Sequence, residues 1–281
     1  MAQRAVNQES ANQEFMLGII PAAGTGNRIQ PLGFSKELLP VGSRLDKGAE
    51  KPKAVSEYLV ERLICAGADK LCFVISPAKT DILEYYASGA WGAQTIFAVQ
   101  EHPDGLCDAV FRPAPFVSAG ETVVIGLPDT VWFPKEALRA LPASGLSLLL
   151  FPVEQPERFD SVVTDEAGAV LEIQVKQPQA RSHWIWGAIK MSGEIYHLLH
   201  RLWRTRQPRD EYLGTLINAW LAAGGSAVGV RAGRRYMDVG TIHGYRAAVE
   251  VLDGSESGWT LSGDLTAGED EEAHASNSLS R

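Results

Sequence analysis

The sequence has few cysteines, no long apolar run and no cluster of basic residues. Three cysteines occur among 281 residues, with no C-x-x-C pair, so a disulfide framework is disfavoured and free thiols in a reducing cytoplasm are expected. No apolar run reaches the roughly 18 residues of a membrane helix, and the polar first 14 residues lack the core of a secretion signal. We therefore predict a cytoplasmic protein with no membrane partner.

The negative charge of the chain is concentrated at its C-terminal end. Of the net charge of -8, residues 253–281 carry -6, from seven acidic residues and one arginine, which leaves -2 for the rest. Binding to a phosphate backbone needs clustered lysines and arginines, so we expect no nucleic-acid partner. The composition predicts a disordered acidic tail over 253–281 and a flexible leader over 1–14.

Short apolar runs alternate with helical patterns along the chain. Buried strands are expected at 16–21, 71–75, 95–99, 122–127, 146–153 and 227–230, and a hairpin at 162–173. Helices are expected at 53–66, 82–86, 193–204, 210–223 and 242–252. This alternation predicts an α/β fold, with a mixed, mostly parallel sheet flanked by helices in one domain over 15–252.

A glycine-rich loop follows the first predicted strand. Its small residues are Ala22, Ala23, Gly24, Thr25 and Gly26. They let backbone N–H groups approach an anion, and Arg28 adds a positive charge. The Gly-Lys-Ser/Thr ending of a Walker A loop is absent, and Ile29 stands where a dinucleotide fingerprint needs its third glycine. Taken alone, the loop is either a phosphate cradle or a structural turn.

A second motif, S-K-E-L-L-P-V at 35–41, lies shortly downstream. Together the two motifs resemble the N-terminal signature of sugar-1-phosphate nucleotidyltransferases, most of all glucose-1-phosphate uridylyl- and thymidylyltransferases. Further motifs follow in the family's order: Lys51-Pro52, Gln100-x-x-Pro103-x-Gly105-Leu106, Leu127-Pro128-Asp129, Lys176-Gln177-Pro178, Trp186-Gly187 and Asp238-Val239-Gly240-Thr241. The resemblance covers roughly 16–252 and implies a Rossmann-like nucleotidyltransferase domain with a small sugar-binding hairpin and helix region.

The resemblance implies attack by a sugar-1-phosphate oxygen on the α-phosphorus of a nucleoside triphosphate, with release of pyrophosphate. Both reactants are polyanions, so such catalysis depends on positioning and charge neutralisation. The family pattern assigns Arg28 to the β- and γ-phosphates, Lys36 to the phosphates of both substrates, and Lys176 to the sugar phosphate. Outside this set of motifs, each would be read as a solvated surface charge.

Two aspartates are candidate metal ligands. Asp129 follows the apolar run at 122–127, where α/β sheets place their ligands, and Asp238 lies far along the chain before Gly240. By resemblance the two carboxylates hold one Mg²⁺, which prefers hard oxygen ligands and few protein contacts. Read separately, each is an ordinary turn or cap aspartate.

The candidate base-binding residues are Gln100, Pro103, Gly105 and Leu106. A Gln amide offers a donor and an acceptor to a pyrimidine edge, and a glycine lets the backbone come close. The chain has Gly-Leu-Cys at 105–107, where relatives that use purine nucleotides tend to have Gly-Thr-Ala. This favours UTP or dTTP; the alternative is a plain Pro-Asp-Gly surface turn.

The chain departs from the family pattern on the sugar side. Val175 stands where a sugar-binding glutamate is usual, although Gly187 matches the glycine near the sugar. The stretch 43–50 is longer than the family's link and is either a surface loop or a lid. Glucose-1-phosphate is the expected acceptor, but another phosphorylated acceptor stays open. So do a regulatory homologue that binds nucleotide without turnover and, more distantly, a dehydrogenase; the oligomeric state is also open, a homo-oligomer included.

Overall fold

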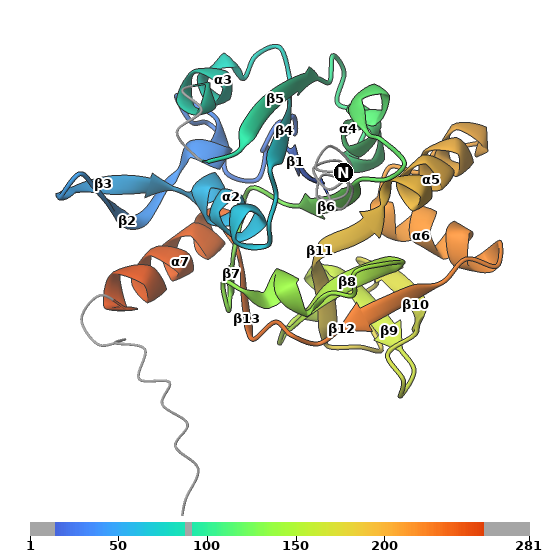
Figure 1. Ribbon diagram of the computed structural model, residues 1–281. Coiled ribbons are helices and arrows are strands. Elements are labelled where there is room, and N and C mark those ends of the chain that lie inside the picture. The colour runs from blue at the N-terminus through green and yellow to red at the C-terminus, as the bar shows by residue number, and fades with distance from the viewer. Residues whose placement is uncertain (1–14, 88–91, 256–281) are drawn as a thin grey trace, which may run out of the picture.

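The computed structural model describes residues 15–87 and 92–255 (Figure 1). The predicted leader at 1–14 and the predicted tail from 256 onward lie outside these residues. The first three residues of the predicted tail, 253–255, instead continue the last helix. No helix in the described ranges is long and apolar enough to cross a membrane.

The first half of the main sheet is parallel, as predicted. Its strands are β1 (Met16–Pro21), β4 (Lys70–Ile75), β5 (Gln94–Val99) and β6 (Thr122–Gly126). They lie side by side in the order β6-β1-β4-β5. The helices between them are α2 (Val55–Cys65), α3 (Thr80–Tyr86) and α4 (Leu106–Phe111). The strands are continuous apolar runs because both faces of a parallel sheet are covered by helices.

The second half of the sheet contains both antiparallel and parallel strand pairs. Its strands are β8 (Leu146–Pro152), β9 (Asp160–Thr164), β10 (Val170–Val175), β11 (Trp184–Ser192) and β12 (Ala227–Val230), and its helices are α5 (Gly193–Thr205) and α6 (Leu213–Ala222). β11 joins the halves by pairing with β6 on one side and with β8 on the other. The predicted hairpin is confirmed as β9–β10. The complete sheet, with both halves taken together, is mixed, as predicted.

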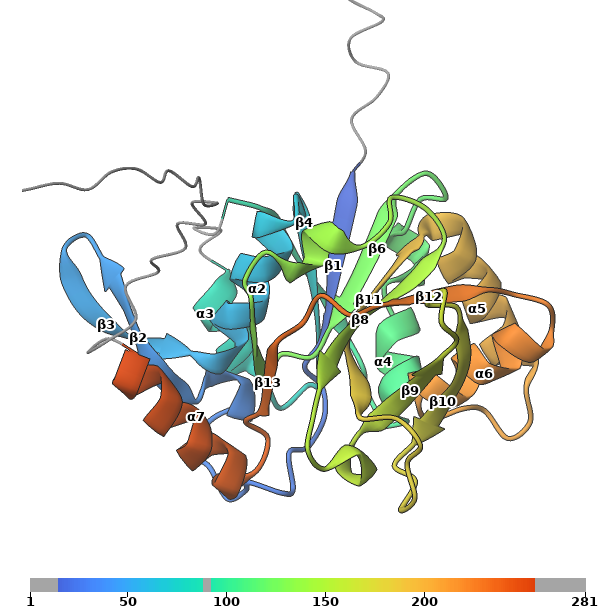
Figure 2. The ribbon, with the colours of Figure 1, turned by 90° about the horizontal axis from the view of Figure 1, so that it is seen from below.

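Two small two-stranded sheets and a last helix complete the fold. They are β2 (Pro40–Asp46) with β3 (Ala49–Ala54), β7 (Thr130–Phe133) with β13 (Arg235–Asp238), and α7 (Ile242–Ser255). Short 3-10 turns lie at η3 (Lys36–Leu38), η4 (Ala114–Phe116), η5 (Ala137–Ala140) and η6 (Pro156–Arg158). Figure 2 shows α7 on the same side of the molecule as β2 and β3.

The stretch 43–50, expected to be a surface loop or a lid, is a β-hairpin. Lys47 and Gly48 at its tip have φ values of 50° and 82°, and two consecutive residues with positive φ form the tight turn that suits paired strands. Lys51-Pro52 therefore lies in β3, and the helix expected from residue 53 begins at Val55. The stretch is paired backbone that leads directly into α2.

The apolar cores lie on opposite faces of the main sheet, as the alternation along β1 shows. Leu17 and Ile19 belong to the cluster that packs with α4, α5 and α6, whereas Ile20 belongs to the cluster that packs with α2 and α3. A third, smaller cluster joins β2, β7 and α7 and includes Val41 and Leu252. This cluster packs the small sheets against the main body.

Arg62 is a buried cation that connects α2 to β7. Its side chain is 2% exposed, and its Nε donates to the Trp132 carbonyl oxygen at 2.9 Å, as does its Nη2. Its Nη1 donates to the Tyr58 carbonyl oxygen at 2.7 Å. Burial lowers the pKa of Arg62 to about 10, against the attraction of nearby Glu61. Arg62 thereby holds β7, the strand that follows Asp129.

We expect Arg62→Leu to lower the free energy of unfolding by about 1.5–3 kcal/mol, because the Trp132 carbonyl loses its charged donors. Urea denaturation measures the change. Arg139→Leu is the control, since Arg139 donates to the Cys65 carbonyl at an exposed position and should cost much less. An unchanged midpoint for Arg62→Leu would contradict a bracing role for this arginine.

Candidate active site

Three segments with predicted site residues meet at one edge of the sheet. Parallel strands present their carboxyl ends at the same edge, where α/β proteins bind ligands. The glycine-rich loop follows β1, Gln100 follows β5, and Asp129 comes shortly after β6. The topology therefore gathers three motifs that are well separated in the sequence.

The two predicted metal-binding aspartates lie side by side because β13 pairs with β7. In this antiparallel ladder Asp238 is opposite Thr130, and the Val239 N–H donates to the Asp129 carbonyl at 2.9 Å. A β-carbon added at Gly240 would lie 2.7 Å from Asp129 Oδ2 and 2.9 Å from Asp238 Oδ1. Both carboxylates thus border the same small space, and only glycine leaves it open.

Two cations face this carboxylate pair. Lys36 Nζ lies 2.5 Å from Asp129 Oδ2, and Arg28 Nη1 lies 3.0 Å from Asp238 Oδ2. The Lys36 side chain is only 14% exposed, whereas that of Arg28 is 62% exposed and free to turn toward a ligand in solvent. The cations offset the repulsion that two close carboxylates would otherwise feel.

The charges in this cluster stabilise one another. Burial works to raise the pKa of Asp129, but Lys36 and Arg28 outweigh it and hold this pKa below its usual range. Burial likewise works to lower the pKa of Lys36, but Asp129 and Glu37 outweigh it and raise that pKa. Asp129 and Lys36 are therefore both ionised at neutral pH.

The glycine-rich loop passes directly over Lys36. Residues 22–23 are buried, residues 24–25 are exposed, and Gly26 has a φ of 69°. A β-carbon at Gly26 would lie 2.9 Å from Lys36 Cδ, so the close approach and the backbone angle both call for glycine here. The N–H groups of residues 23–26 find no acceptor within the described chain. They are available to an anion.

A buried ion pair holds this loop against Lys36, and the sequence motifs gave no sign of it. Lys79 Nζ lies 2.8 Å from Glu37 Oε2 and donates to the Ala22 carbonyl at 2.7 Å. Glu37 is 1% exposed and Lys79 is 8% exposed, and burial raises the pKa of Glu37 and lowers that of Lys79. The motif around Lys36 and the loop after β1 are thus tied through one ammonium group.

The Gln100 side chain already has hydrogen-bond partners within the protein. Its side chain is 3% exposed, and its Nε2 donates to the Gly105 carbonyl at 3.1 Å and to Asp108 Oδ2 at 2.8 Å. Both amide hydrogens are used within the protein, so Gln100 cannot donate to a base and only its carbonyl oxygen can accept. Of the other predicted base-binding residues, Pro103 is exposed and Leu106 begins α4.

Lys176 and Gly187 lie in the second half of the sheet, the first just after β10 and the second within β11. Lys176 follows β10 with a φ of 46°, and its Nζ lies 4.4 Å from the centre of the Tyr212 ring. Gly187 is buried at a β-bulge in β11, and a β-carbon there would lie 2.5 Å from Phe151 Cε2 and 3.0 Å from Tyr236 Cε2. Packing against two aromatic rings is sufficient reason for this glycine.

Asp160 is a carboxylate of this region that the sequence reading missed. It pairs with Val175 across the β9–β10 ladder. Burial raises its pKa, and the positive charge of neighbouring Lys176 opposes that shift. The buried Trp186 Nε1 has no acceptor in hydrogen-bonding geometry among the described residues. A lone aspartate at a strand start carries no signal in the sequence, so only the fold reveals this grouping.

Tyr236 connects the two groups of charges. It lies on β13 two residues before Asp238, and burial raises its pKa well above the usual value. The carboxylates of Asp238, Asp129 and Asp160 push in the same direction. The aspartate pair and Asp160 therefore both lie near this half-buried tyrosine.

Comparisons with known proteins show which proteins this chain is similar to. A family model described as nucleotidyl transferase matches residues 17–253. A glucose-1-phosphate thymidylyltransferase of Neisseria gonorrhoeae is 30% identical over 60% of this chain and 58% of its own length. One of Mycolicibacterium smegmatis is 28% identical over 80% of this chain and 78% of its own. A UDP-glucose pyrophosphorylase structure from Acinetobacter baumannii is similar in fold, with a TM-score of 0.68, 20% identity, and coverage of 86% of this chain and 94% of that chain.

We expect Glu37→Gln and Lys79→Met each to lower the free energy of unfolding by about 3–5 kcal/mol, because either change leaves a buried charge unpaired. The double variant should lose clearly less than the sum of the two. Urea denaturation of the two single variants and the double variant measures the free energies of unfolding for this double-mutant cycle. Glu172→Gln, which breaks an exposed pair with Arg181, should cost at most about 1 kcal/mol. Strict additivity would show that Glu37 and Lys79 do not act as a pair.

Proposed function

The chain belongs to the nucleotidyl transferase family, and from this premise we propose that it transfers a nucleoside monophosphate from UTP or dTTP to a sugar-1-phosphate, with release of pyrophosphate. The observation that carries the proposal is the convergence of Asp129 and Asp238 opposite Lys36 and Arg28. This arrangement meets the needs of a reaction between two polyanions, which are a place for a divalent metal and cations for the phosphates.

The donor set at Asp129 and Asp238 fits Mg²⁺. It offers hard carboxylate oxygens, Asp129 is ionised at neutral pH, and the described residues hold no cluster of three or more His, Cys, Asp or Glu that would suit a fully protein-bound metal. We propose that Asp129 and Asp238 hold Mg²⁺, which when bound neutralises phosphate charge. Lys36 and Arg28 are then released from their carboxylate partners to contact phosphate oxygens.

The phosphates of the triphosphate are proposed to lie along the glycine-rich loop. The N–H groups of residues 23–26 offer donors, and Lys36 lies directly beneath Gly26. Arg28 is exposed and its planar guanidinium can grip two oxygens of the β- and γ-phosphates. The ion pair of Lys79 with Glu37 fixes this arrangement, so these two are positioning residues.

The proposed base preference rests on the remaining hydrogen-bonding capacity of Gln100. Because its Nε2 is used by Gly105 and Asp108, its carbonyl oxygen is an acceptor. Uracil and thymine carry an N–H at ring position 3 that can donate to it, whereas cytosine presents an acceptor there. This favours UTP or dTTP over CTP and does not choose between them.

The acceptor is proposed to bind on the side of Lys176 and Asp160. Lys176 neutralises its phosphate, and Asp160 accepts hydrogen bonds from hydroxyl groups. Val175, which stands where a sugar-binding glutamate is usual, packs against α6, since a β-carbon at Gly214 would lie 2.7 Å from its Cγ2. Asp160, directly across the ladder from Val175, supplies the carboxylate that Val175 lacks.

One observation favours a second candidate, the same transfer to a different phosphorylated acceptor. Moving the carboxylate from position 175 to Asp160 on the neighbouring strand changes where a hydroxyl must lie, so glucose-1-phosphate need not fit best. A regulatory homologue without turnover is disfavoured because the aspartate pair and both cations are present. We place the activity in the cytoplasm, in keeping with the free thiols of Cys65, Cys72 and Cys107.

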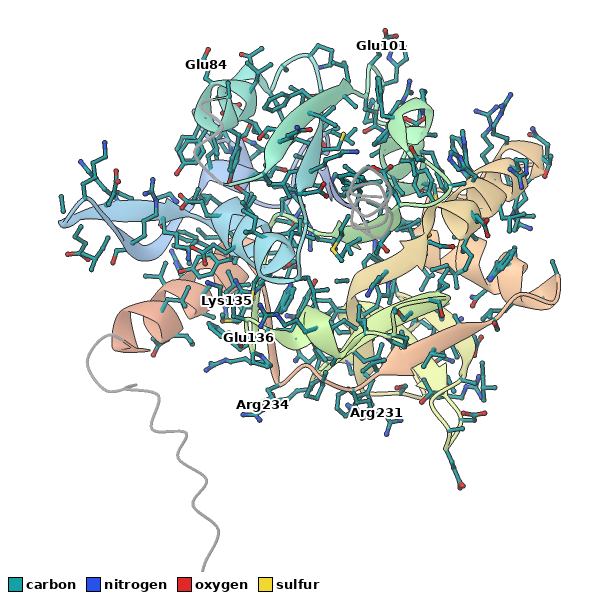
Figure 3. The ribbon with its side chains drawn as sticks, in the orientation of Figure 1. Glu84, Glu101, Lys135, Glu136, Arg231 and Arg234 are labelled. Carbon is teal, nitrogen blue, oxygen red and sulfur yellow. The ribbon has the colours of Figure 1, made fainter. Side chains whose placement is uncertain are left out.

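We expect the protein with Mg²⁺, UTP or dTTP, and glucose-1-phosphate to release pyrophosphate. Asp129→Asn or Asp238→Asn should lower kcat by about 100-fold or more, because each loses a proposed metal ligand. A coupled pyrophosphate assay over a panel of triphosphates and sugar phosphates measures both. Glu136→Gln removes an exposed carboxylate, labelled in Figure 3, and should act as wild type. Absence of pyrophosphate with every combination would refute the activity.

We expect Asp160→Asn to raise KM for the sugar phosphate by about tenfold, the value of one charge-assisted hydrogen bond, with little change in kcat or in KM for the triphosphate. Steady-state kinetics with each substrate varied in turn measures the split. Asp165→Asn, in the exposed β9–β10 turn, is the matched control. Equal losses for both substrates would point to a structural role for Asp160.

A further inference from the structure

A second concave site lies between α4 and α5, apart from the carboxylate cluster. The groove has a volume of about 570 Å³ and is lined by Phe111, Arg112, His197, His200, Arg204 and Arg209, among others. Figures 1 and 2 show α5 on the side of the molecule away from α7 and the β2–β3 hairpin. Of its lining residues, only Asp108 contacts a residue assigned to the proposed transfer, because it accepts from Gln100 Nε2.

Stacked rings form the floor of this groove. The His200 ring lies 5.0 Å from Phe111 with an interplanar angle of 19°, and 6.1 Å from Trp203 with an angle of 27°. Phe111 and Trp203 are buried, whereas His200 is partly exposed. The floor therefore presents a flat aromatic surface to a ligand, with rings held in place from below.

Positive charge is concentrated around this floor. Arg204 and Arg209 are exposed and form no ion pair with any described residue, and the Arg209 guanidinium lies 5.1 Å from the centre of the Trp203 ring. The single acidic lining residue, Asp108, is already paired with Arg112 at 2.8 Å. A chain with a net charge of -8 thus carries a cationic groove.

We propose that this groove binds an organic phosphate, with the phosphate group on Arg204 and Arg209 and the organic part over His200. Guanidinium groups grip phosphate oxygens through paired hydrogen bonds, and an aromatic floor accommodates a ring. The volume is in the range of small-molecule pockets, which are largely apolar with a few polar groups that fix orientation.

The groove is connected to the proposed base site through one carboxylate. Arg112 Nε donates to Asp108 Oδ2 at 2.9 Å, and Gln100 Nε2 donates to the same oxygen at 2.8 Å. A phosphate held by Arg204 and Arg209 also attracts Arg112, which lines the same groove. Moving Arg112 leaves Asp108, which is 9% exposed, without its counter-charge and disturbs Gln100. Occupancy of the groove therefore weakens binding of the triphosphate; this consequence, unlike the groove site itself, rests on the proposed function.

Isothermal titration calorimetry with AMP tests the site directly. Arg204→Gln/Arg209→Gln should raise the Kd for AMP by at least about tenfold, because two charged phosphate contacts are lost. The matched control is Arg231→Gln/Arg234→Gln, two exposed arginines labelled in Figure 3 and outside the groove. This control and Lys36→Met should both keep the wild-type affinity. AMP should also bind more tightly than inorganic phosphate, because only AMP reaches the aromatic floor.

Three outcomes would overturn the site. Wild-type protein that binds neither AMP nor phosphate has no such site. Unchanged affinity in Arg204→Gln/Arg209→Gln, or loss of binding in Lys36→Met, would assign any bound phosphate to the catalytic centre. Equal affinity for AMP and inorganic phosphate would reduce the groove to a simple anion site. None of these results depends on whether the protein turns over a sugar phosphate.

The coupling has its own readout. AMP should raise KM for the triphosphate by about fivefold or more in wild type and in Arg231→Gln/Arg234→Gln, with kcat unchanged, and should have little effect in Arg204→Gln/Arg209→Gln. Equal inhibition of the groove variant would overturn the coupling and leave the binding result intact. If no triphosphate is turned over at all, the proposed function fails while the calorimetry still decides the groove.

Discussion

The site depends on holding two carboxylates together against their mutual repulsion. The β7–β13 ladder provides the holding force, since its register sets Asp238 next to Asp129. Lys36 and Arg28 provide the compensation, each within 3.0 Å of one carboxylate. Neither part is sufficient alone, because paired strands without the cations would bring together two like charges, and cations without the strands would have no fixed partners. A centre of this kind is neutral overall yet strongly polarised, and such a centre suits a polyanionic ligand that arrives with its own metal.

Buried polar contacts behind the site fix the groups that face the ligand. Arg62 bonds the Trp132 carbonyl and so anchors β7 to α2. Lys79 joins Glu37 to the Ala22 carbonyl and so anchors the loop that follows β1. Both are cations that the protein has removed from water, which is costly unless every donor finds an acceptor. Both lie behind the groups that are proposed to contact phosphate. A small displacement of such a contact has a large effect on rate, so rigid support at this place suits a reaction that depends on positioning.

The sequence predicted the parts of the fold that local pattern determines. The apolar runs of β1, β4 and β6 identify buried strands without reference to the rest of the chain, and the spacing of α5 identifies a helix. β7 and β13 have four residues each and are stabilised by each other across a long separation, so neither shows a pattern of its own. The same distinction between local pattern and folded packing applies to the site residues. Motifs predicted that Asp129 and Asp238 meet, whereas Asp160, Lys79 and the commitment of both Gln100 hydrogens are properties of the folded packing alone.

The long separation between β7 and β13 also affects how the protein is made. A ribosome releases the chain from its N-terminus, so Lys36 and Asp129 emerge long before β13 does. Until then Asp129 has its ammonium partner but no second carboxylate, and the entropy of closing so large a loop delays the final pairing further. A partly synthesised chain can therefore assemble its parallel half without bringing Asp238 next to Asp129.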